Sequence, residues 1–369
     1  MKISRKGAVL ALATAAVLAM SSCAANEGGA APGGSTESGT SLSGMLGGSG
    51  SSAMATAQET WVAEFQTKNP DVTVNYSPDG SGAGREAFAG GGVDFAGSDR
   101  AMKPDELTPE ALASSRCDPS QGAMNLPVYI SPIAVIYKVE GVTELKLDAD
   151  TLASIFAGKI TKWNDPKITA LNEGASLPDQ NITAVHRADD SGTTENFTEY
   201  LHEAAPSVWT AEPDGEWPFP GGEAAPQTSG VVDAVTNGTG TIGYADASKA
   251  GDLGVAQIKV GDTFVAYSPE AAAAVVDASE RVTGEGRSAN DWTIALNRTA
   301  EGDVYPIVLL AYAIACQKYT DAATAEKVKA YLGYIASAEG QQAAAKAAGS
   351  APLSEKLSAD VEAATATIS

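Results

Sequence analysis

From residue 41 to the C-terminus, strand-like and helix-like stretches alternate along this chain. Residues 72–76 (VTVNY) and 181–186 (NITAVH) are typical of strands, whereas residues 194–203 carry apolar side chains at helical spacing. Each of these two strand-like stretches leads into a turn rich in glycine, serine or threonine. Alternation on this scale predicts an α/β protein with mostly parallel sheets, and 369 residues leave room for two domains.

Three turns combine glycine with small hydroxyl side chains, at residues 50–53 (GSSA), 80–84 (GSGAG) and 191–194 (SGTT). Each precedes a helix-like stretch. The first N–H groups of a helix lack partners within the helix and lie at the positive end of its dipole, so they bind anions without a large positive charge. Together with Arg187 and Asp99, the three turns suggest a cage for a small tetrahedral oxyanion.

The composition excludes several other functions. A net charge of −22 argues against a nucleic-acid partner, because nothing here could replace the counterions of a phosphate backbone. A desolvated pocket for a small anion depends on its own donors, because salt screens surface charges beyond about 8 Å.

Residues 238–243 match G-x-G-x-x-G, but a strand-like stretch follows the glycines, so the dinucleotide interpretation fails. The two histidines show no metal-ligand spacing and no obvious nucleophile partner, and we expect no metal, no cofactor and no enzymatic activity.

The N-terminus is predicted to be a targeting segment. Basic residues precede an apolar stretch that is too short to span a bilayer comfortably, and small residues then lead to Cys23. This end resembles the lipobox of bacterial lipoproteins. We therefore expect a signal peptide at 1–22, lipid attached to Cys23, and a flexible tether over 23–40. An ordinary signal peptide with an incidental cysteine is the alternative.

Two cysteines, Cys117 and Cys316, remain in the predicted mature protein. An exported protein with two remaining cysteines more often pairs them than leaves them free. We therefore predict a disulfide between them. This pairing requires that the two cysteines lie in the same structural lobe of the folded protein.

Two segments carry further structural expectations. Residues 126–139 are rich in strand-forming residues, and Pro127 and Pro132 are expected to mark strand limits. Residues 322–337 have the pattern of an amphipathic helix that stops near Gly340.

The strongest local signal is the segment around the third turn. Arg187 ends a predicted strand, where its planar guanidinium could hold two oxygens of an anion, and Asp189 could hold that guanidinium in place. Ser191, Gly192 and Thr193 occupy the turn into the following helix. The alternative for this segment alone is a capped helix with a surface salt bridge.

Several motifs resemble, in order, those of the phosphate-binding proteins of bacterial phosphate ABC transporters, the PstS family. The similarity covers essentially all of the chain after Ser41. The motifs are VDFAGSD at 93–99, the segment 147–165 with IFAGKITKW, the run QNITAVHRADDSGT at 180–193, and GTIGY at 240–244.

The resemblance implies a set of phosphate ligands. Counting back from Trp61 places the first-turn ligands at Ser52 and Ala53, and Asp189 matches the residue that pairs with the arginine. The remaining implied ligands are Ser81, Asp99, Arg187, Ser191, Gly192 and Thr193.

The resemblance also implies a two-lobed, hinged α/β fold of the periplasmic-binding-protein type II. Its first lobe is interrupted, at 41–126 and 306–369, and the second lobe is inserted at 127–305. Both Cys117 and Cys316 then fall in the first lobe, and the ligand lies in the cleft between lobes.

Asp99 gives the expected site its selectivity. Phosphate at neutral pH retains an O–H donor that an ionised carboxylate can accept, whereas sulfate has none and would face an unmatched buried carboxylate. A structural Asp99 that caps a nearby turn is the alternative.

The expected function is capture of inorganic phosphate outside the cytoplasmic membrane, where lipid on Cys23 anchors the protein, and delivery to the permease of an ABC transporter. A binding protein for another oxyanion, such as sulfate or molybdate, and a phosphatase of the same fold are the alternatives.

Overall fold

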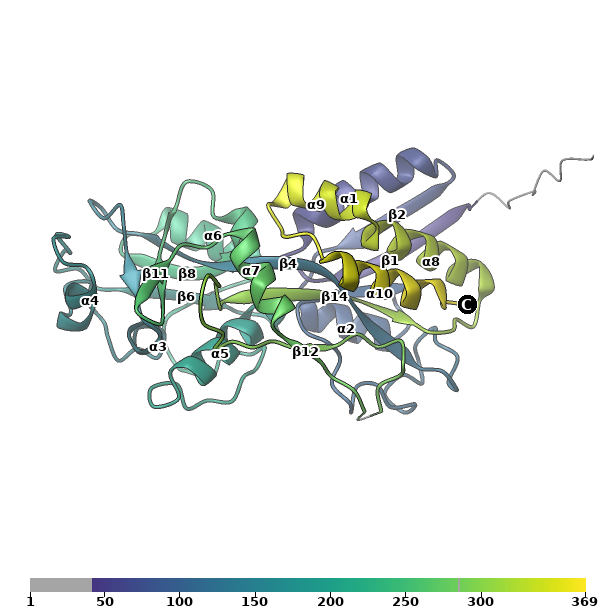
Figure 1. Ribbon diagram of the computed structural model, residues 1–369, viewed down its shortest axis with the longest axis horizontal. Coiled ribbons are helices and arrows are strands. Elements are labelled where there is room, and N and C mark those ends of the chain that lie inside the picture. Colours follow the sequence, from purple (N-terminus) through teal and green to yellow (C-terminus); the bar gives the residue numbers. More distant parts are fainter. Residues whose placement is uncertain (1–41, 285) are drawn as a thin grey trace, which may run out of the picture. The chain divides into compact units, whose positions relative to one another are not determined.

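The computed structural model describes residues 42–284 and 286–369 (Figure 1). The predicted signal peptide, the predicted lipid site at Cys23 and the predicted tether lie outside these residues. None of the helices in the described part of the chain has the length and apolar character needed to cross a lipid bilayer.

The largest sheet runs in the order β2-β1-β3-β14-β4-β8-β6-β7, and β9 also pairs with β4. Its strands are β1 Gly44–Gly50, β2 Val72–Ser77, β3 Phe95–Ser98, β4 Ala123–Lys138, β6 Thr183–Arg187, β7 Glu223–Ala225, β8 Thr241–Asp246, β9 Gly254–Val255 and β14 Val308–Cys316. Two short sheets hold β5 Lys146–Leu147, β10 Gln257–Val260 and β11 Thr263–Val265, and β12 Glu280–Arg281 and β13 Ile294–Ala295.

The largest sheet is mixed, so the expectation of mostly parallel sheets is wrong. Strand β1 pairs in parallel with β2 and β3, and β6 pairs in parallel with β7 and β8. Strands β4 and β14, however, run antiparallel to each other and to their outer neighbours β8 and β3. Both strands are buried over almost their whole length, so they join the two parallel groups through a continuous apolar centre.

Helices follow most of the strands. They are α1 Ala55–Lys68, α2 Ser81–Ala89, α3 Ala149–Phe156, α4 Pro166–Leu171, α5 Gly192–Ala204, α6 Gln227–Asn237, the 3₁₀ turn η1 Ala247–Lys249, α7 Pro269–Asp277, α8 Ala322–Ala336, α9 Ala338–Ala348 and α10 Glu355–Ala366. Helix α5 confirms the helical spacing seen in the sequence: Phe197, Tyr200 and Leu201 are buried on one side of it.

Strand β4 does not end at its prolines, and the expectation that Pro127 and Pro132 mark strand limits is wrong. The register with β14 shifts beside Pro127, which lies opposite Tyr312, so this proline occupies an irregularity of the ladder. Pairing with β14 ends at Pro132, and pairing with β8 begins at Ile133. The prolines therefore mark a bulge and a change of partner within one long strand.

A second helix follows α8 almost immediately, which the sequence analysis did not predict. Helix α8 ends at Ala336, and the Ser337 hydroxyl then accepts a hydrogen bond from the Gly340 amide as the N-cap of α9. Gly340 thus lies in the first turn of a new helix. Its carbonyl accepts a 2.7 Å hydrogen bond from the indole of Trp61 on α1.

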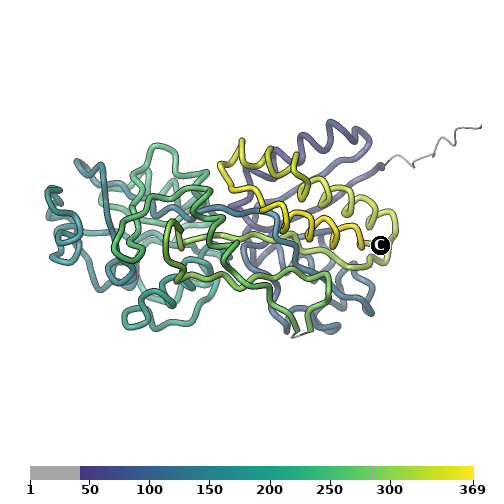
Figure 2. Tube along the Cα trace, in the orientation of Figure 1, coloured from purple at the N-terminus to yellow at the C-terminus, as the bar shows by residue number. Residues whose placement is uncertain are grey.

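The C-terminal helices pack against the N-terminal part of the chain. Helix α9 packs on α1, and α8 contacts β1 and α10, so purple and yellow segments run side by side in Figure 2. The predicted disulfide between Cys117 and Cys316 is present and ties the same two parts together. These contacts are those expected if residues near both ends of the described chain build one lobe.

Candidate functional site

The structure brings the three glycine- and serine-rich turns into mutual contact. The first turn follows β1, the second lies between β2 and α2, and the third lies between β6 and α5. The Gly80 amide donates to the Gly50 carbonyl over 2.8 Å, and the Gly82 amide donates to the Asp190 carbonyl over 3.1 Å. Segments that are far apart in the sequence therefore enclose one small polar region.

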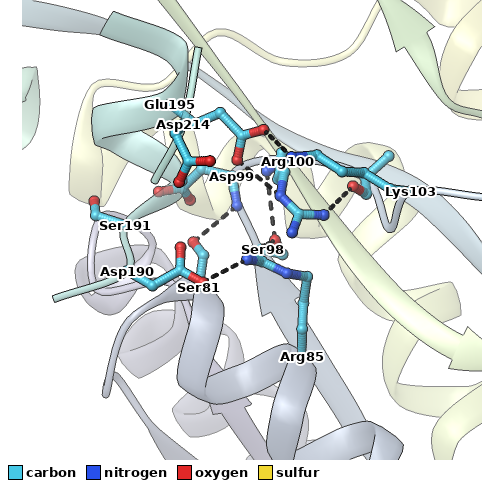
Figure 3. Close-up of polar contacts among 12 residues, drawn as sticks. Ser81, Arg85, Ser98, Asp99, Arg100, Lys103, Asp190, Ser191, Glu195 and Asp214 are labelled. Carbon is cyan, nitrogen blue, oxygen red and sulfur yellow. Dashed lines mark hydrogen bonds and ion pairs between the residues drawn. The ribbon is translucent and has the colours of Figure 1, made fainter. Parts of the chain in front are cut away.

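Asp99 lies at the end of β3, inside this region, and is 2 % exposed. Its Oδ2 accepts a 2.8 Å hydrogen bond from the Thr193 hydroxyl. Its amide donates to the Ser81 hydroxyl over 3.1 Å (Figure 3). Its Oδ1 is buried and has no hydrogen-bond partner among the described residues. An unpaired carboxylate oxygen in such a place is costly, so the site can gain much from a ligand that donates to it.

Burial raises the pKa of Asp99, because desolvation disfavours its charged form. The hydroxyls of Ser51, Thr193 and Ser81 and the positive charge of Arg187 oppose this rise without cancelling it. Three hydroxyls and a guanidinium from separate segments thus favour the ionised form of one buried carboxyl group. The side chain of Asp99 accepts from the Thr193 hydroxyl, and no backbone amide among the described residues donates to it, as a turn cap would require.

Arg187 and Asp189 form the ion pair that the sequence predicts. Asp189 Oδ1 lies 2.8 Å from Arg187 Nε, and its other oxygen pairs with Nη2. Burial acts to raise the pKa of Asp189, but the hydrogen bond and charge of Arg187, with the Gln227 amide, outweigh burial and lower this pKa. Gly80 lies against the pair: its φ is +108°, and a Cβ there would come within 2.6 Å of Asp189 Oδ2.

The third turn begins α5 directly over Asp99. The Ser191 hydroxyl accepts from the Thr194 amide over 3.2 Å, so this side chain is the N-cap, as in the alternative for this segment; the ion pair of that alternative is not at the surface, since Arg187 is 3 % exposed. A Cβ at Gly192 would lie 2.8 Å from both Asp99 Cβ and Ser81 Oγ, so glycine lets the helix start approach this closely. The N–H groups of Gly192 and Thr193 belong to the first turn of the helix, where donors lack partners within the helix.

The first turn differs from the expected arrangement in its side chains. The Ser52 hydroxyl lies 3.0 Å from the Thr228 hydroxyl and accepts from the Thr228 amide over 3.1 Å, which joins it to the start of α6. Ala53 is fully buried in the hydrophobic core, so only its backbone could serve a ligand. The hydroxyl of Ser51, which was not among the expected ligands, lowers the pKa of Asp99; it accepts from the Met54 amide over 3.3 Å, and no hydrogen bond joins it to Asp99.

Two further residues, which no sequence pattern indicated, hold the site together. The Asn196 amide donates to the carbonyl oxygens of Asp99, over 2.6 Å, and Gly192, over 2.8 Å. Arg298 is 1 % exposed and donates to Asn196 Oδ1 and, over 2.6 Å, to the Val308 carbonyl. A lone arginine in a polar segment gives no sequence signal for such a contact.

Among the described residues, no group of three or more histidine, cysteine, aspartate or glutamate side chains is arranged to hold a metal ion. His186 Nδ1 lies 2.9 Å from the Arg187 carbonyl, and His202 Nδ1 lies 2.9 Å from the Ala211 carbonyl. Both rings therefore contact backbone oxygens.

Known sequences resemble this chain over most of its length. A family model described as a PBP superfamily domain matches residues 30–339. The phosphate-binding protein PstS 3 of Mycobacterium tuberculosis is 37% identical over 342 residues, covering 90% of each chain. PstS 3 of Mycobacterium leprae is 38% identical over 344 residues, again covering 90% of each chain. PstS 2 of Mycobacterium tuberculosis is 36% identical over 379 residues, covering 100% of both.

Solved structures share the fold. A high-affinity periplasmic phosphate-binding protein termed PfluDING, bound with phosphate, superposes with a TM-score of 0.69 at 23% identity, covering 86% of this chain and 93% of its own. A putative phosphate ABC transporter substrate-binding protein from Clostridium perfringens gives a TM-score of 0.57 at 19% identity, covering 83% and 98%. The fold is thus the predicted two-lobed, periplasmic-binding-protein-like α/β architecture.

Proposed function

This chain belongs to the PstS family of phosphate-binding proteins, and we propose that it captures inorganic phosphate outside the cytoplasmic membrane and delivers it to the permease of an ABC transporter. The protein performs no chemistry on its ligand in this proposal. The relatives that match it over most of their length are named as binding proteins.

The observation that carries the proposal is the unpaired, buried Oδ1 of Asp99. It lies beside hydroxyl donors and near the Arg187 guanidinium, so an anion that carries both negative charge and a proton would satisfy the group. Phosphate at neutral pH is such an anion, because it accepts from the donors and gives its O–H to the carboxylate. Sulfate would leave the carboxylate unmatched.

The proposed ligand set follows the family motif. Asp189 engages the edge of Arg187 formed by Nε and Nη2, so the edge formed by Nη1 and the second N–H of Nη2 would be left for two-centre contact with the anion. Helix starts would supply amides, and side chains would supply hydroxyls. The proposed phosphate-binding residues are Ser52, Ala53, Ser81, Asp99, Arg187, Ser191, Gly192 and Thr193, of which Ala53 and Gly192 would act through their backbone alone.

We assign residues 41–126 and 306–369 to one lobe and residues 127–305 to the other. The disulfide and the packing of α9 on α1 support the first assignment. On this division the site draws Asp99 from one lobe and Arg187 from the other, so that binding would bridge and close the cleft.

The proposal includes export and anchoring. PfluDING is described as periplasmic, and residues 1–22 have the pattern of a signal peptide. Lipid on Cys23 would then hold the protein at the outer face of the membrane, close to permease subunits.

Calorimetry with purified protein tests the proposal. Wild-type protein should bind phosphate, arsenate should compete, and phosphate should be preferred over sulfate by at least about 100-fold. Asp99→Asn should remove most of that preference, whereas the matched change Asp118→Asn, at an exposed ion pair with Lys318, should leave it intact. Absence of phosphate binding by wild-type protein would refute the proposal. Release of phosphate from a phosphomonoester would favour the phosphatase alternative.

A further inference from the structure

Six charged side chains form a continuous series of ion pairs beside the candidate site, and Figure 3 labels all of them except Glu106. We call them the charge bridge. They come from α2, from the segment after β3 and from the start of α5. The charge bridge consists of Arg85, Arg100, Lys103, Glu106, Asp190 and Glu195.

The series runs from Asp190, the residue before the N-cap of α5, to Glu195 in the first turn of α5, and Lys103 pairs with Glu195 beyond it. Asp190 Oδ2 lies 3.0 Å from Arg85 Nη2, and Arg85 Nε lies 3.3 Å from Glu106. Glu106 Oε1 accepts from Arg100 Nη2 over 2.9 Å, and Arg100 Nε lies 2.7 Å from Glu195 Oε2. Three positive groups thus balance three negative groups, since Lys103 Nζ also lies 3.1 Å from Glu195.

The centre of the charge bridge is shielded from water. The side chains of Arg85, Arg100 and Glu195 are 4, 15 and 13 % exposed. Burial acts to raise the pKa of Glu106, but the hydrogen bonds and charges of Arg100 and Arg85 outweigh it and lower this pKa to about 2. The ion pairs in the centre of the charge bridge are therefore less screened than surface pairs, whereas Asp190 and Lys103 at its two ends are 42 and 47 % exposed.

The position of the charge bridge links it to the site. Asp190 and Glu195 stand on either side of residues 191–194, the turn that begins α5 over Asp99. Their cationic partners belong to the segments that carry Ser81 and Asp99. Gly82 allows the close approach, because a Cβ there would lie 2.3 Å from Asp190 Oδ2.

We propose that the charge bridge is a latch that sets how long bound phosphate stays in the site. This inference rests on the proposed function. The ligand is enclosed between the start of α5 and the segment that ends β3, so it leaves only when these separate. That separation breaks the contacts of Arg85 with Asp190 and of Arg100 with Glu195. The latch residues touch each other rather than the anion, and they act by holding the closed arrangement.

The direction in which the rate of phosphate release changes distinguishes a latch from simple electrostatic repulsion. Removing a negative charge near an anion site should by itself slow the release of the anion, because repulsion falls. Removing half of a latch should speed release, because partly buried charges lose their partner. Neutralising Glu195 or Asp190 therefore gives opposite outcomes under the two explanations.

The experiment measures release of radiolabelled inorganic phosphate from the full-length protein into excess unlabelled phosphate. Glu195→Gln and Asp190→Asn should each raise the dissociation rate constant about tenfold, while the association rate constant changes by less than about threefold. The dissociation rate of the wild type should also rise between about 0.01 M and 1 M salt, where the screening length falls from about 30 to 3 Å, and the double variant should show a smaller rise.

Asp214→Asn is the matched control. Asp214 lies next to α5, because the Thr198 hydroxyl donates to its carbonyl oxygen over 3.4 Å. Its side chain is exposed, and no ion pair joins it to another described residue. Its neutralisation should leave release unchanged or slow it slightly. Unchanged or slower release in both latch variants would overturn the inference, as would an effect confined to association. Failure of the wild type to bind phosphate at all would instead contradict the proposed function.

Discussion

The Thr193 hydroxyl donates to Asp99 Oδ2 over 2.8 Å, although the two residues are 94 positions apart in the sequence. One oxygen of the buried carboxylate is thereby fixed from the start of α5, and the other lacks a partner among the described residues. The protonation state of this one group should therefore decide which anions the site accepts.

The affinity for sulfate should rise as the pH falls. Burial raises the pKa of Asp99 above its usual 3.8, so the ionised form is disfavoured in the folded protein and protonation occurs at a higher pH than in the unfolded chain. Once protonated, Asp99 presents a donor instead of an unmatched acceptor, and sulfate no longer meets a bare carboxylate. Calorimetric titration with sulfate from neutral pH down through the raised pKa should show progressively tighter binding.

Asp99→Asn is the control for this pH dependence. An asparagine presents an amide donor at every pH, so its sulfate affinity should vary much less over the same range. A sulfate affinity that stays equally weak in the wild type at all these values would contradict the assigned role of the carboxylate.

Gly192→Ala should weaken phosphate binding by about 10- to 100-fold with little effect on folding. The added Cβ would lie 2.8 Å from Ser81 Oγ and Asp99 Cβ, closer than real Cβ contacts allow. The clash arises only where α5 meets the segments that carry Ser81 and Asp99, and alanine is well tolerated in the first turn of a helix. The free energy of unfolding should therefore change by less than about 1 kcal/mol. Gly333→Ala is the matched control, because the nearest atom lies 4.0 Å from the added Cβ in the interior of α8. Equal phosphate affinities of the two variants would show that close approach at Gly192 is not required.

Removal of the disulfide should lower stability without removing the site. Cys117 and Cys316 are buried and separated by 199 positions, so their bond greatly restricts the unfolded chain. The double variant Cys117→Ser/Cys316→Ser should lose about 2–5 kcal/mol in denaturant unfolding. Its phosphate affinity at low denaturant should stay within about threefold of the wild type, since neither cysteine has a hydrogen bond to a proposed ligand. Unaltered stability would mean that the bond does not form in solution.

The sequence predicts the site where its groups are neighbours along the chain. Arg187, Asp189 and Ser191 lie within five residues, so a strand-to-turn-to-helix pattern was enough to predict the ion pair, and the N-cap was the weighed alternative. The contact of Ser52 with Thr228 joins residues 176 positions apart. Such contacts depend on packing of distant segments, which local patterns do not contain.

The same limit applies to the sheet. Alternation of strands and helices predicts the class of fold, but it does not give the direction of a strand that returns from a distant segment. Strand β14 enters the sheet between β3 and β4 and runs against both, and Pro127 is tolerated because the ladder is irregular beside it. Both facts depend on which strands become neighbours.

Asn196→Ala should reduce phosphate affinity about tenfold. The side-chain amide donates to the carbonyl oxygens of Asp99 and Gly192 and so fixes two parts of the site relative to each other, while Arg298 orients the amide. Asn172→Ala is a matched control. This buried amide also donates to two carbonyl oxygens, those of Lys146 and Ile168.

Both variants should lose about 1–3 kcal/mol of unfolding free energy, because buried carbonyl groups lose their donor. Only Asn196→Ala should weaken phosphate binding, since the Asn172 contacts join α4 to β5 rather than two parts of the site. Calorimetry and denaturant unfolding on the same preparations separate the two effects. If both variants bound phosphate equally well, Asn196 would be a structural residue without influence on the site.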